Sequence, residues 1–90
     1  MKNYLLLNGP NLNLLGDREK SIYGESSLEE IERKLIKLAT NNNCQLITFQ
    51  SNAEHELVDK IQEARNQEIS CILFNPGAFT HTSIALRDAI

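Results

Sequence analysis

The side chains best suited to chemistry in this sequence are those of Arg18 and Tyr23, in a polar segment near the N-terminus. Arginine and tyrosine are residue types that take part in acid–base steps and orient substrates. A free tyrosine has a pKa of about 10 and is almost fully protonated at neutral pH, whereas a guanidinium held beside it favours the charged form. Each residue alone also has an ordinary interpretation, as a half-buried packing tyrosine and a solvated surface arginine.

Polar side chains also follow two apolar runs of strand type. The first run ends in Asn8-Gly9-Pro10-Asn11, and a later run ends in Asn75-Pro76-Gly77, with His81 shortly beyond it. Histidine is a common acid or base, and asparagine amides can bind polar ligands. Asparagines in such turns can equally satisfy their own backbone. A shared site requires a fold that brings the two turns together.

The hydrophobic pattern predicts three strands that alternate with three helices. Apolar residues recur at helical spacing from Leu28 to Leu38, and Ser27 with Glu30 forms a capping box before them. We expect Ser51 or Asn52 to cap the next helix. The expected strands span residues 4–7, 44–50 and 69–74, and the expected helices span residues 28–40, 54–66 and 83–90.

This alternation is typical of an α/β fold with a parallel sheet and right-handed crossovers. The ninety residues read as a single domain, 1–90, without internal repeats. Residues 69–74 are almost wholly apolar, which predicts a strand buried on both faces of the sheet. With the strand order 2-1-3, the two polar turns are neighbours at the carboxyl ends of the strands, where α/β proteins bind ligands.

The long segment between the first strand and the first helix is expected to be a lid over that pocket. Connections of this length without secondary structure are usually functional or disordered. Leucines within the segment provide apolar anchors, and Gly16 and Gly24 provide hinge positions on either side of Arg18 and Tyr23.

Composition and motif spacing argue against several other classes of protein. The net charge of −3 disfavours nucleic acid as a partner, and the N-terminus is neither a signal peptide nor a membrane span. The sequence has no dinucleotide-binding or P-loop glycine motif, no serine-nucleophile elbow and no metal-ligand spacing. Cys44 and Cys71 each lie in an expected strand, and we expect them to be buried free thiols in a reducing cytoplasm.

Four motifs together closely resemble type II 3-dehydroquinate dehydratase. They are Leu-Asn-Gly-Pro-Asn-Leu-Asn-Leu-Leu-Gly up to Gly16, Arg18 with Tyr23-Gly24, Gln50-Ser51-Asn52, and Asn75-Pro76-Gly77-Ala78-Phe79-Thr80-His81-Thr82-Ser83 with the Ala-Leu-Arg-Asp-Ala that follows at 85–89. The resemblance spans all ninety residues. It implies a flavodoxin-like α/β/α fold with the strand order 2-1-3-4-5 and a homo-oligomer, a dodecamer built as a tetramer of trimers.

The resemblance also implies a lyase that converts 3-dehydroquinate to 3-dehydroshikimate through an enolate, in the shikimate pathway of aromatic amino acid biosynthesis or in quinate breakdown. It implies a cytoplasmic enzyme with a small-molecule substrate, without a metal or organic cofactor. By this resemblance Tyr23 removes the C2 proton, Arg18 supports it, and Asn11 positions a water near the enolate. The implied substrate-binding residues are Asn75, His81 and Asp88.

The family also has parts that this sequence does not contain. Its proton donor is a histidine on a later segment, for which His81 is a poor substitute, and a later arginine contacts the substrate carboxylate. We therefore expect the domain to be incomplete at its C-terminal side, without the last two strands, and the isolated ninety residues to lack activity. The alternatives are a non-catalytic flavodoxin-like binding or assembly module, an inactive fragment, and a flavin or nucleotide carrier of the same fold.

Overall fold

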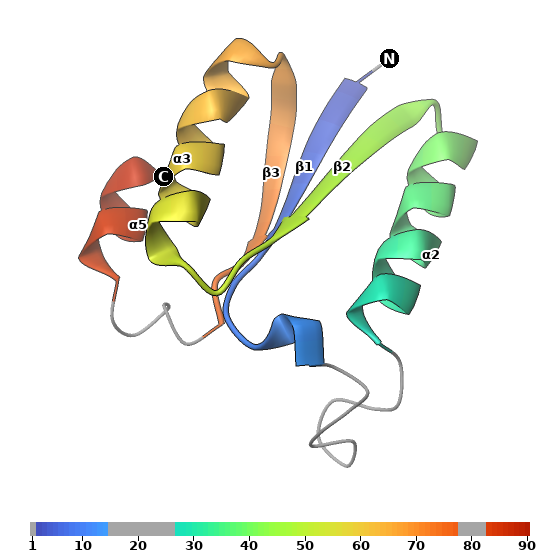
Figure 1. Cartoon of the computed structure of the whole chain (residues 1–90). Helices are drawn as coiled ribbons and strands as arrows, with labels where there is room; N and C mark the ends of the chain where they lie inside the picture. Colours follow the sequence, from blue (N-terminus) through green and yellow to red (C-terminus); the bar gives the residue numbers. More distant parts are fainter. Residues whose placement is uncertain (1, 15–26, 78–82) are drawn as a thin grey trace.

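The computed structural model describes residues 2–14, 27–77 and 83–90 of the chain. These residues form a three-stranded parallel sheet in the order β2-β1-β3, with helices beside it (Figure 1). The strands are β1 (Lys2–Asn8), β2 (Cys44–Gln50) and β3 (Ile69–Asn75), the α-helices are α2 (Leu28–Asn41), α3 (Glu54–Glu63) and α5 (Ile84–Ala89), and two 3₁₀ turns are η1 (Leu12–Leu14) and η2 (Ala64–Asn66). The predicted α/β class and strand order 2-1-3 are confirmed.

The two crossovers place helices on opposite faces of the sheet. The connection from β1 through α2 leads to one neighbour of β1, and the connection from β2 through α3 leads to its other neighbour. Right-handed crossovers that run in opposite directions put their helices on opposite faces. Helices α3 and α5 lie together on one side, whereas α2 packs along β2 (Figure 1). This is the predicted flavodoxin-like arrangement of three layers.

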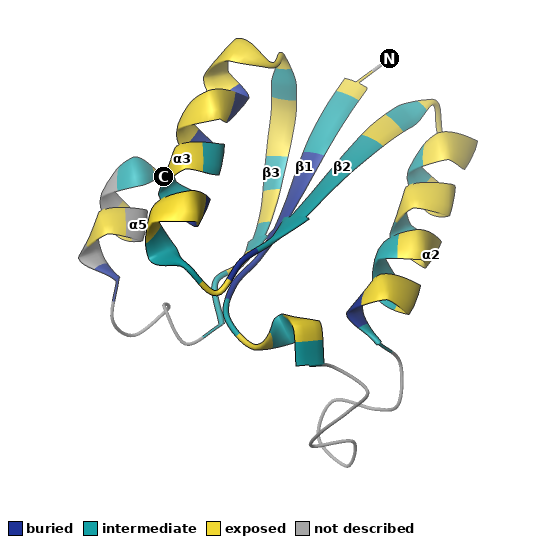
Figure 2. Ribbon diagram, viewed as in Figure 1, coloured by how far each residue is buried: buried dark blue, intermediate teal, exposed yellow. Residues whose placement is uncertain are grey.

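The hydrophobic core lies between the central strand β1 and helix α3. Leu5, Leu7 and Leu57 are the largest fully buried side chains, and Ile61 and Ala64 complete the buried cluster. In Figure 2 the buried positions gather on β1 and on one side of α3. Because successive side chains of a strand point to opposite faces, Leu5 and Leu7 share the α3 face. This packing fixes β1 in the middle of the sheet.

The helix ends follow the predicted capping at one helix and depart from it at the other. Ser27 Oγ accepts a hydrogen bond from Glu30 N at 3.1 Å, which confirms the N-cap of α2. Helix α3 instead begins after Ala53, which makes no side-chain cap hydrogen bond. The predicted cap by Ser51 or Asn52 is therefore wrong. Both of those side chains make other hydrogen bonds in the turn that precedes Ala53.

The remaining predicted elements differ from the structure only near their ends. The predicted helix 54–66 is α-helical as far as Glu63 and continues as the 3₁₀ turn η2. Tightening of a last helical turn in this way is common. The turn η1 was not predicted. None of the helices within the described ranges is long and apolar enough to cross a membrane.

Strand β3 is more exposed than its apolar sequence predicts. It is an edge strand of the described sheet, and its burial alternates. Ile72 and Phe74 pack against the core, whereas Cys71 and Leu73 are exposed. Because α2 packs along β2, the described residues cover only one face of β3. The predicted burial of this strand on both faces is therefore wrong for the described part of the chain.

The two cysteines are free, as predicted, but they are not buried. Cys44 is half-buried at the start of β2, and Cys71 is exposed on the edge strand β3. The central strand separates them, and Tyr4 of β1 pairs with Cys71. Cys44 lies beside Tyr4 and raises the pKa of the tyrosine hydroxyl above its ordinary value. The prediction of buried thiols is therefore wrong, because it assumed a sheet covered on both faces.

The exposed edge at β3 leads to a prediction about association. Leu73 is 46% exposed on an apolar edge strand, and such an edge pairs readily with another chain. We expect the ninety-residue polypeptide to self-associate as its concentration rises, and Leu73→Lys to reduce this association because a charge at a strand edge opposes pairing. Sedimentation velocity at increasing concentration measures the effect.

Leu38→Lys provides the matched control for this experiment. Leu38 is 59% exposed, more than Leu73, but it lies on helix α2 and not on a strand. Its substitution should leave association at the edge of the sheet unchanged. If the two variants reduced association equally, general surface hydrophobicity and not the β3 edge would be the cause.

Candidate functional site

The three strands end at one edge of the sheet, and hydrogen bonds tie their final turns together. Gly9 N–H donates to the Asn75 carbonyl oxygen at 2.8 Å, and Ser51 N–H donates to the Asn8 carbonyl oxygen at 3.1 Å. The register places Asn8 opposite both Gln50 and Asn75. The two polar turns that the sequence predicts to be neighbours are therefore in direct contact.

The turns after β1 and β3 also pack closely against each other. Gly9 is buried and has no room for a Cβ atom, which would overlap the Pro76 carbonyl oxygen and lie 2.6 Å from its carbonyl carbon. Gly77 has a φ of +59°, in the left-handed region that glycine adopts without strain. A Cβ atom on Gly77 would lie 3.1 Å from the Pro10 carbonyl oxygen. The two turns are therefore closely packed at the carboxyl ends of the strands, and we call them the floor of the candidate site.

Asn11 directly follows Pro10 in the turn after β1, and it is exposed to solvent. Its φ is 68°, a left-handed conformation that asparagine adopts more readily than most residues. Its carbonyl oxygen accepts from Leu14 N at 3.0 Å, and its N–H donates to Asn52 Oδ1 at 2.9 Å. Within the described ranges the exposed side-chain amide of Asn11 makes no hydrogen bond. The backbone of Asn11 therefore serves the turn, and its side chain can serve a ligand.

Asn75 combines a role in its turn with a capacity for binding. Its Oδ1 accepts from Gly77 N at 3.3 Å, which is the turn-satisfying role that the sequence left open for it. This bond uses only the oxygen of the side-chain amide, so Nδ2 can still donate. Asn75 is exposed. Asn11 and Asn75 thus present amide groups from two adjoining turns.

Asn8 is a third polar residue at this edge, and the sequence interpretation gave it no role beyond the turn. It is buried, and its Nδ2 group has no acceptor among the residues that the structure describes. A buried donor without an acceptor carries a desolvation penalty, and such groups often bind a water or a ligand. The signal in the sequence was an asparagine that ends an apolar strand, which is also the signal of an ordinary turn.

Of the other predicted site residues, the structure describes the backbone position of Asp88 alone. Arg18, Tyr23 and His81 lie outside the described residues, as does the greater part of the predicted lid. Asp88 lies in helix α5, which follows the turn after β3. The structure therefore brings together the turns that carry Asn11 and Asn75. The positions of Arg18, Tyr23 and His81 remain predictions.

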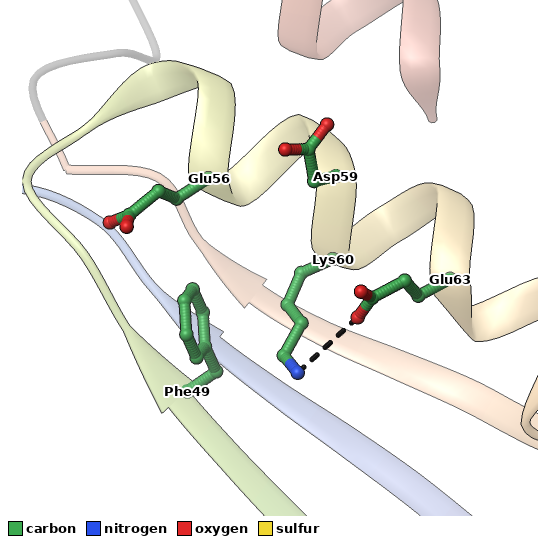
Figure 3. Close-up of a pocket in the computed structure, with 5 residues that line it drawn as sticks. All are labelled: Phe49, Glu56, Asp59, Lys60 and Glu63. Atoms are coloured by element: carbon green, nitrogen blue, oxygen red, sulfur yellow. Dashed lines mark ion pairs between the residues drawn. The ribbon is translucent and has the colours of Figure 1, made fainter.

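A separate hollow of about 190 Å³ lies between β2 and α3 (Figure 3). Its lining includes Phe49, Glu56, Asp59, Lys60 and Glu63. Lys60 Nζ lies 5.0 Å from the centre of the Phe49 ring and 3.4 Å from Glu63 Oε2. The ammonium group is thus already engaged by an aromatic face and a carboxylate. We therefore place the candidate active site at the strand ends and not in this hollow.

Comparisons with known proteins show which proteins the chain resembles. A curated 3-dehydroquinate dehydratase of Nitrosomonas eutropha is 59% identical over 86 residues, covering 96% of this chain and 59% of that protein. One from Legionella pneumophila strain Corby is 58% identical over 90 residues, covering 100% of this chain and 62% of that protein. The crystal structure of a type II dehydroquinase from Butyrivibrio crossotus superposes with a TM-score of 0.95 at 44% identity, covering 98% of this chain and 61% of that one.

The chain thus spans about three fifths of the length of the curated relatives that it matches. The model of the family described as Dehydroquinase class II matches residues 2–90, which is nearly the whole chain. These ninety residues belong to the class II dehydroquinase family.

Proposed function

We propose that the protein containing these residues is a lyase that dehydrates 3-dehydroquinate to 3-dehydroshikimate. The observation that carries the proposal is the contact between the turns after β1 and β3, which brings together the turns that carry Asn11 and Asn75 at the strand ends. Curated relatives with the name of this enzyme support it. The reaction belongs to aromatic amino acid biosynthesis or to quinate breakdown.

The proposed mechanism begins with removal of the C2 proton by the Tyr23 phenolate. The electron pair of the broken C–H bond moves into the adjacent ketone and forms an enolate, whose negative charge develops on oxygen. The Arg18 guanidinium supports the phenolate because a nearby positive charge favours the charged form of a phenol. Asn11 then stabilises the enolate, directly or through a water, from a backbone that is already fixed before substrate binds.

The second half of the reaction expels the hydroxyl group. The enolate electrons return to form the carbon–carbon double bond of the enone, and the hydroxyl leaves as water after it receives a proton. Asn75, His81 and Asp88 are proposed to bind the substrate and to hold its ring against the floor of the site. We assign the proton donor to none of the residues that the structure describes.

The proposed assembly and location follow from the family and not from the fold of one chain. We infer a dodecamer built as a tetramer of trimers, in the cytoplasm, with the small-molecule substrate as the partner and no nucleic acid or membrane bound. The formal net charge of −3 is in keeping with the absence of a nucleic-acid partner.

A direct assay tests the proposed reaction. The natural protein that contains these residues is mixed with 3-dehydroquinate, and the conjugated enone of the product is followed by its ultraviolet absorbance. Asn11→Ala should lower kcat about 100-fold, because removing one stabilising group from a developing oxyanion has an effect of that order. Gln45→Ala, an exposed position on β2, is the control. Tight binding of the substrate without any turnover would instead favour a non-catalytic binding module.

A further inference from the structure

Side chains of the turn after β2 bind the turn after β1, a role that the proposed mechanism does not include. Gln50 Nε2 donates to the Gly9 carbonyl oxygen and to Asn52 Oδ1, both at 3.1 Å, and it lies 3.5 Å from Asn13 Oδ1. Asn52 Oδ1 also accepts from Asn11 N at 2.9 Å. Two of these bonds join residues 41 positions apart in the sequence. We name this network of hydrogen bonds the Gln50–Asn52 latch.

The latch depends on the chemical identity of both side chains. Three oxygen atoms surround Gln50 Nε2, so this position requires a donor. Two donors converge on Asn52 Oδ1, and an amide oxygen has two lone pairs with which to accept them. A glutamate at position 50 would place carboxylate oxygens, which only accept hydrogen bonds, next to oxygen atoms that also only accept them. An aspartate at position 52 would still offer an oxygen to both donors.

The turn that carries the latch is itself fixed to helix α3. Ser51 is buried, its Oγ accepts from Ala53 N at 2.9 Å, and its hydroxyl donates to the Glu56 carboxylate. Figure 3 shows Glu56 on α3 with its carboxylate directed towards the chain that connects β2 to the helix. Ser51 N–H also bonds the Asn8 carbonyl oxygen. The latch therefore ties the turn after β1 to a part of the protein that is already held in place.

We propose that Gln50 and Asn52 are positioning residues that hold Asn11 in the conformation its catalytic role requires. Asn11 has a φ of 68°, which is a minor conformation for any residue with a side chain. The bond from its N–H to Asn52 Oδ1 stabilises that conformation directly. Without the bond, Asn11 samples the commoner negative φ values, and these aim its side chain elsewhere. The proposal has two parts. The structural part, that the latch fixes the conformation of Asn11, depends only on the hydrogen bonds. The catalytic part, that this conformation is needed for the reaction, rests on the proposed function.

The structural part is tested by amide hydrogen exchange in the natural protein that contains these residues. Asn52→Ala removes the acceptor and should speed exchange of the Asn11 amide by about twofold to tenfold, the range for loss of one hydrogen bond. The amide of Ile31, bonded to the Ser27 carbonyl oxygen in α2, is the internal reference and should not change. Unchanged exchange at Asn11 in Asn52→Ala would overturn the latch.

Two variants that add the same charge to the same turn separate the latch from a general electrostatic effect. Asn52→Asp keeps the acceptor and should hold Asn11 exchange within about twofold of wild type. Gln50→Glu replaces the donor and should speed exchange at least as much as Asn52→Ala. Gln45→Glu, at the exposed start of the same strand, controls for a charge on β2. Equal effects of Asn52→Asp and Gln50→Glu would contradict the proposal.

The catalytic part is tested by steady-state kinetics on the same variants. Asn52→Ala should lower kcat about tenfold or more, since small misplacements of a catalytic group have effects of this size. KM should change less than kcat, because Asn11 acts on a charge that develops only in the transition state. Faster exchange at Asn11 with an unchanged kcat would overturn the catalytic part and leave the latch intact. A wild-type protein without turnover would contradict the proposed function. The latch would still be tested by hydrogen exchange at the Asn11 amide, which does not depend on activity.

Discussion

Tyr23→Phe is expected to lower kcat by about three orders of magnitude or more, with a much smaller change in KM. The substitution removes only the phenolic oxygen and keeps the aromatic ring, so we expect the protein to keep its fold. A positioned base commonly contributes about 10²- to 10⁴-fold to the rate. In the proposed mechanism, removal of the C2 proton generates the enolate, so no later group can compensate for the loss of this step. Steady-state enone absorbance gives kcat and KM separately.

The sequence contains a matched control for this experiment. Tyr4 is the only other tyrosine of the ninety residues, and it lies in the middle of the sheet on β1. Tyr4→Phe removes the same atom from a place without a proposed catalytic role and should leave kcat within about threefold of wild type. Retention of even a tenth of wild-type kcat in Tyr23→Phe would make the assignment of the base wrong.

Gly9→Ala is expected to reduce the free energy of unfolding by about 3 kcal/mol, at the upper end of the typical cost of overpacking an interior. The added methyl group would overlap the Pro76 carbonyl oxygen. Both sides of the clash are backbone, so neither can rotate away as a flexible side chain would. Separation of the two turns would also break the Gly9 N–H bond to the Asn75 carbonyl oxygen. Urea unfolding followed by circular dichroism measures the change.

Gly77→Ala gives a graded comparison at the same contact. A Cβ atom there would lie 3.1 Å from the Pro10 carbonyl oxygen, and an alanine would have to adopt a φ of +59°. The expected loss is about 1 kcal/mol, smaller than that for Gly9→Ala. If Gly77→Ala lost more free energy of unfolding than Gly9→Ala, close packing of the turns after β1 and β3 would not be what stabilises the carboxyl ends of these strands.

Local sequence signals predicted the parts of the fold that depend on neighbouring residues. The stripe of apolar residues from Leu28 to Leu38 and the cap by Ser27 depend on contacts within a few positions, and both are confirmed. The strand order 2-1-3 was implied by the resemblance to type II 3-dehydroquinate dehydratase, because the alternation of strands and helices indicates the α/β class but not the order. The contact between the turns at Asn8 and Asn75 then followed from that order.

The features that the sequence did not predict arise from contacts between distant residues. Asn52 was interpreted as a possible helix cap and Gln50 was given no role of its own, because nothing near them in the sequence reveals that the turn after β1 lies alongside. The exposure of Leu73 and Cys71 depends on which neighbours cover β3, which an apolar run cannot show. The lack of an acceptor for Asn8 Nδ2 within residues 2–14, 27–77 and 83–90 depends on how these distant segments pack around it, which the sequence does not show.

The central place of β1 also determines when the chain can fold during its synthesis. Lys2 pairs with Cys44 and Asn8 pairs with Asn75, so β1 leaves the ribosome well before the partners with which it pairs. Pairings between distant residues have a large loop-closure entropy cost and form slowly. One side of β1 can be paired once β2 has emerged, and the latch can form soon afterwards. The floor beneath Asn11 is complete only when Pro76 arrives, which makes this edge one of the last features of the ninety residues to form.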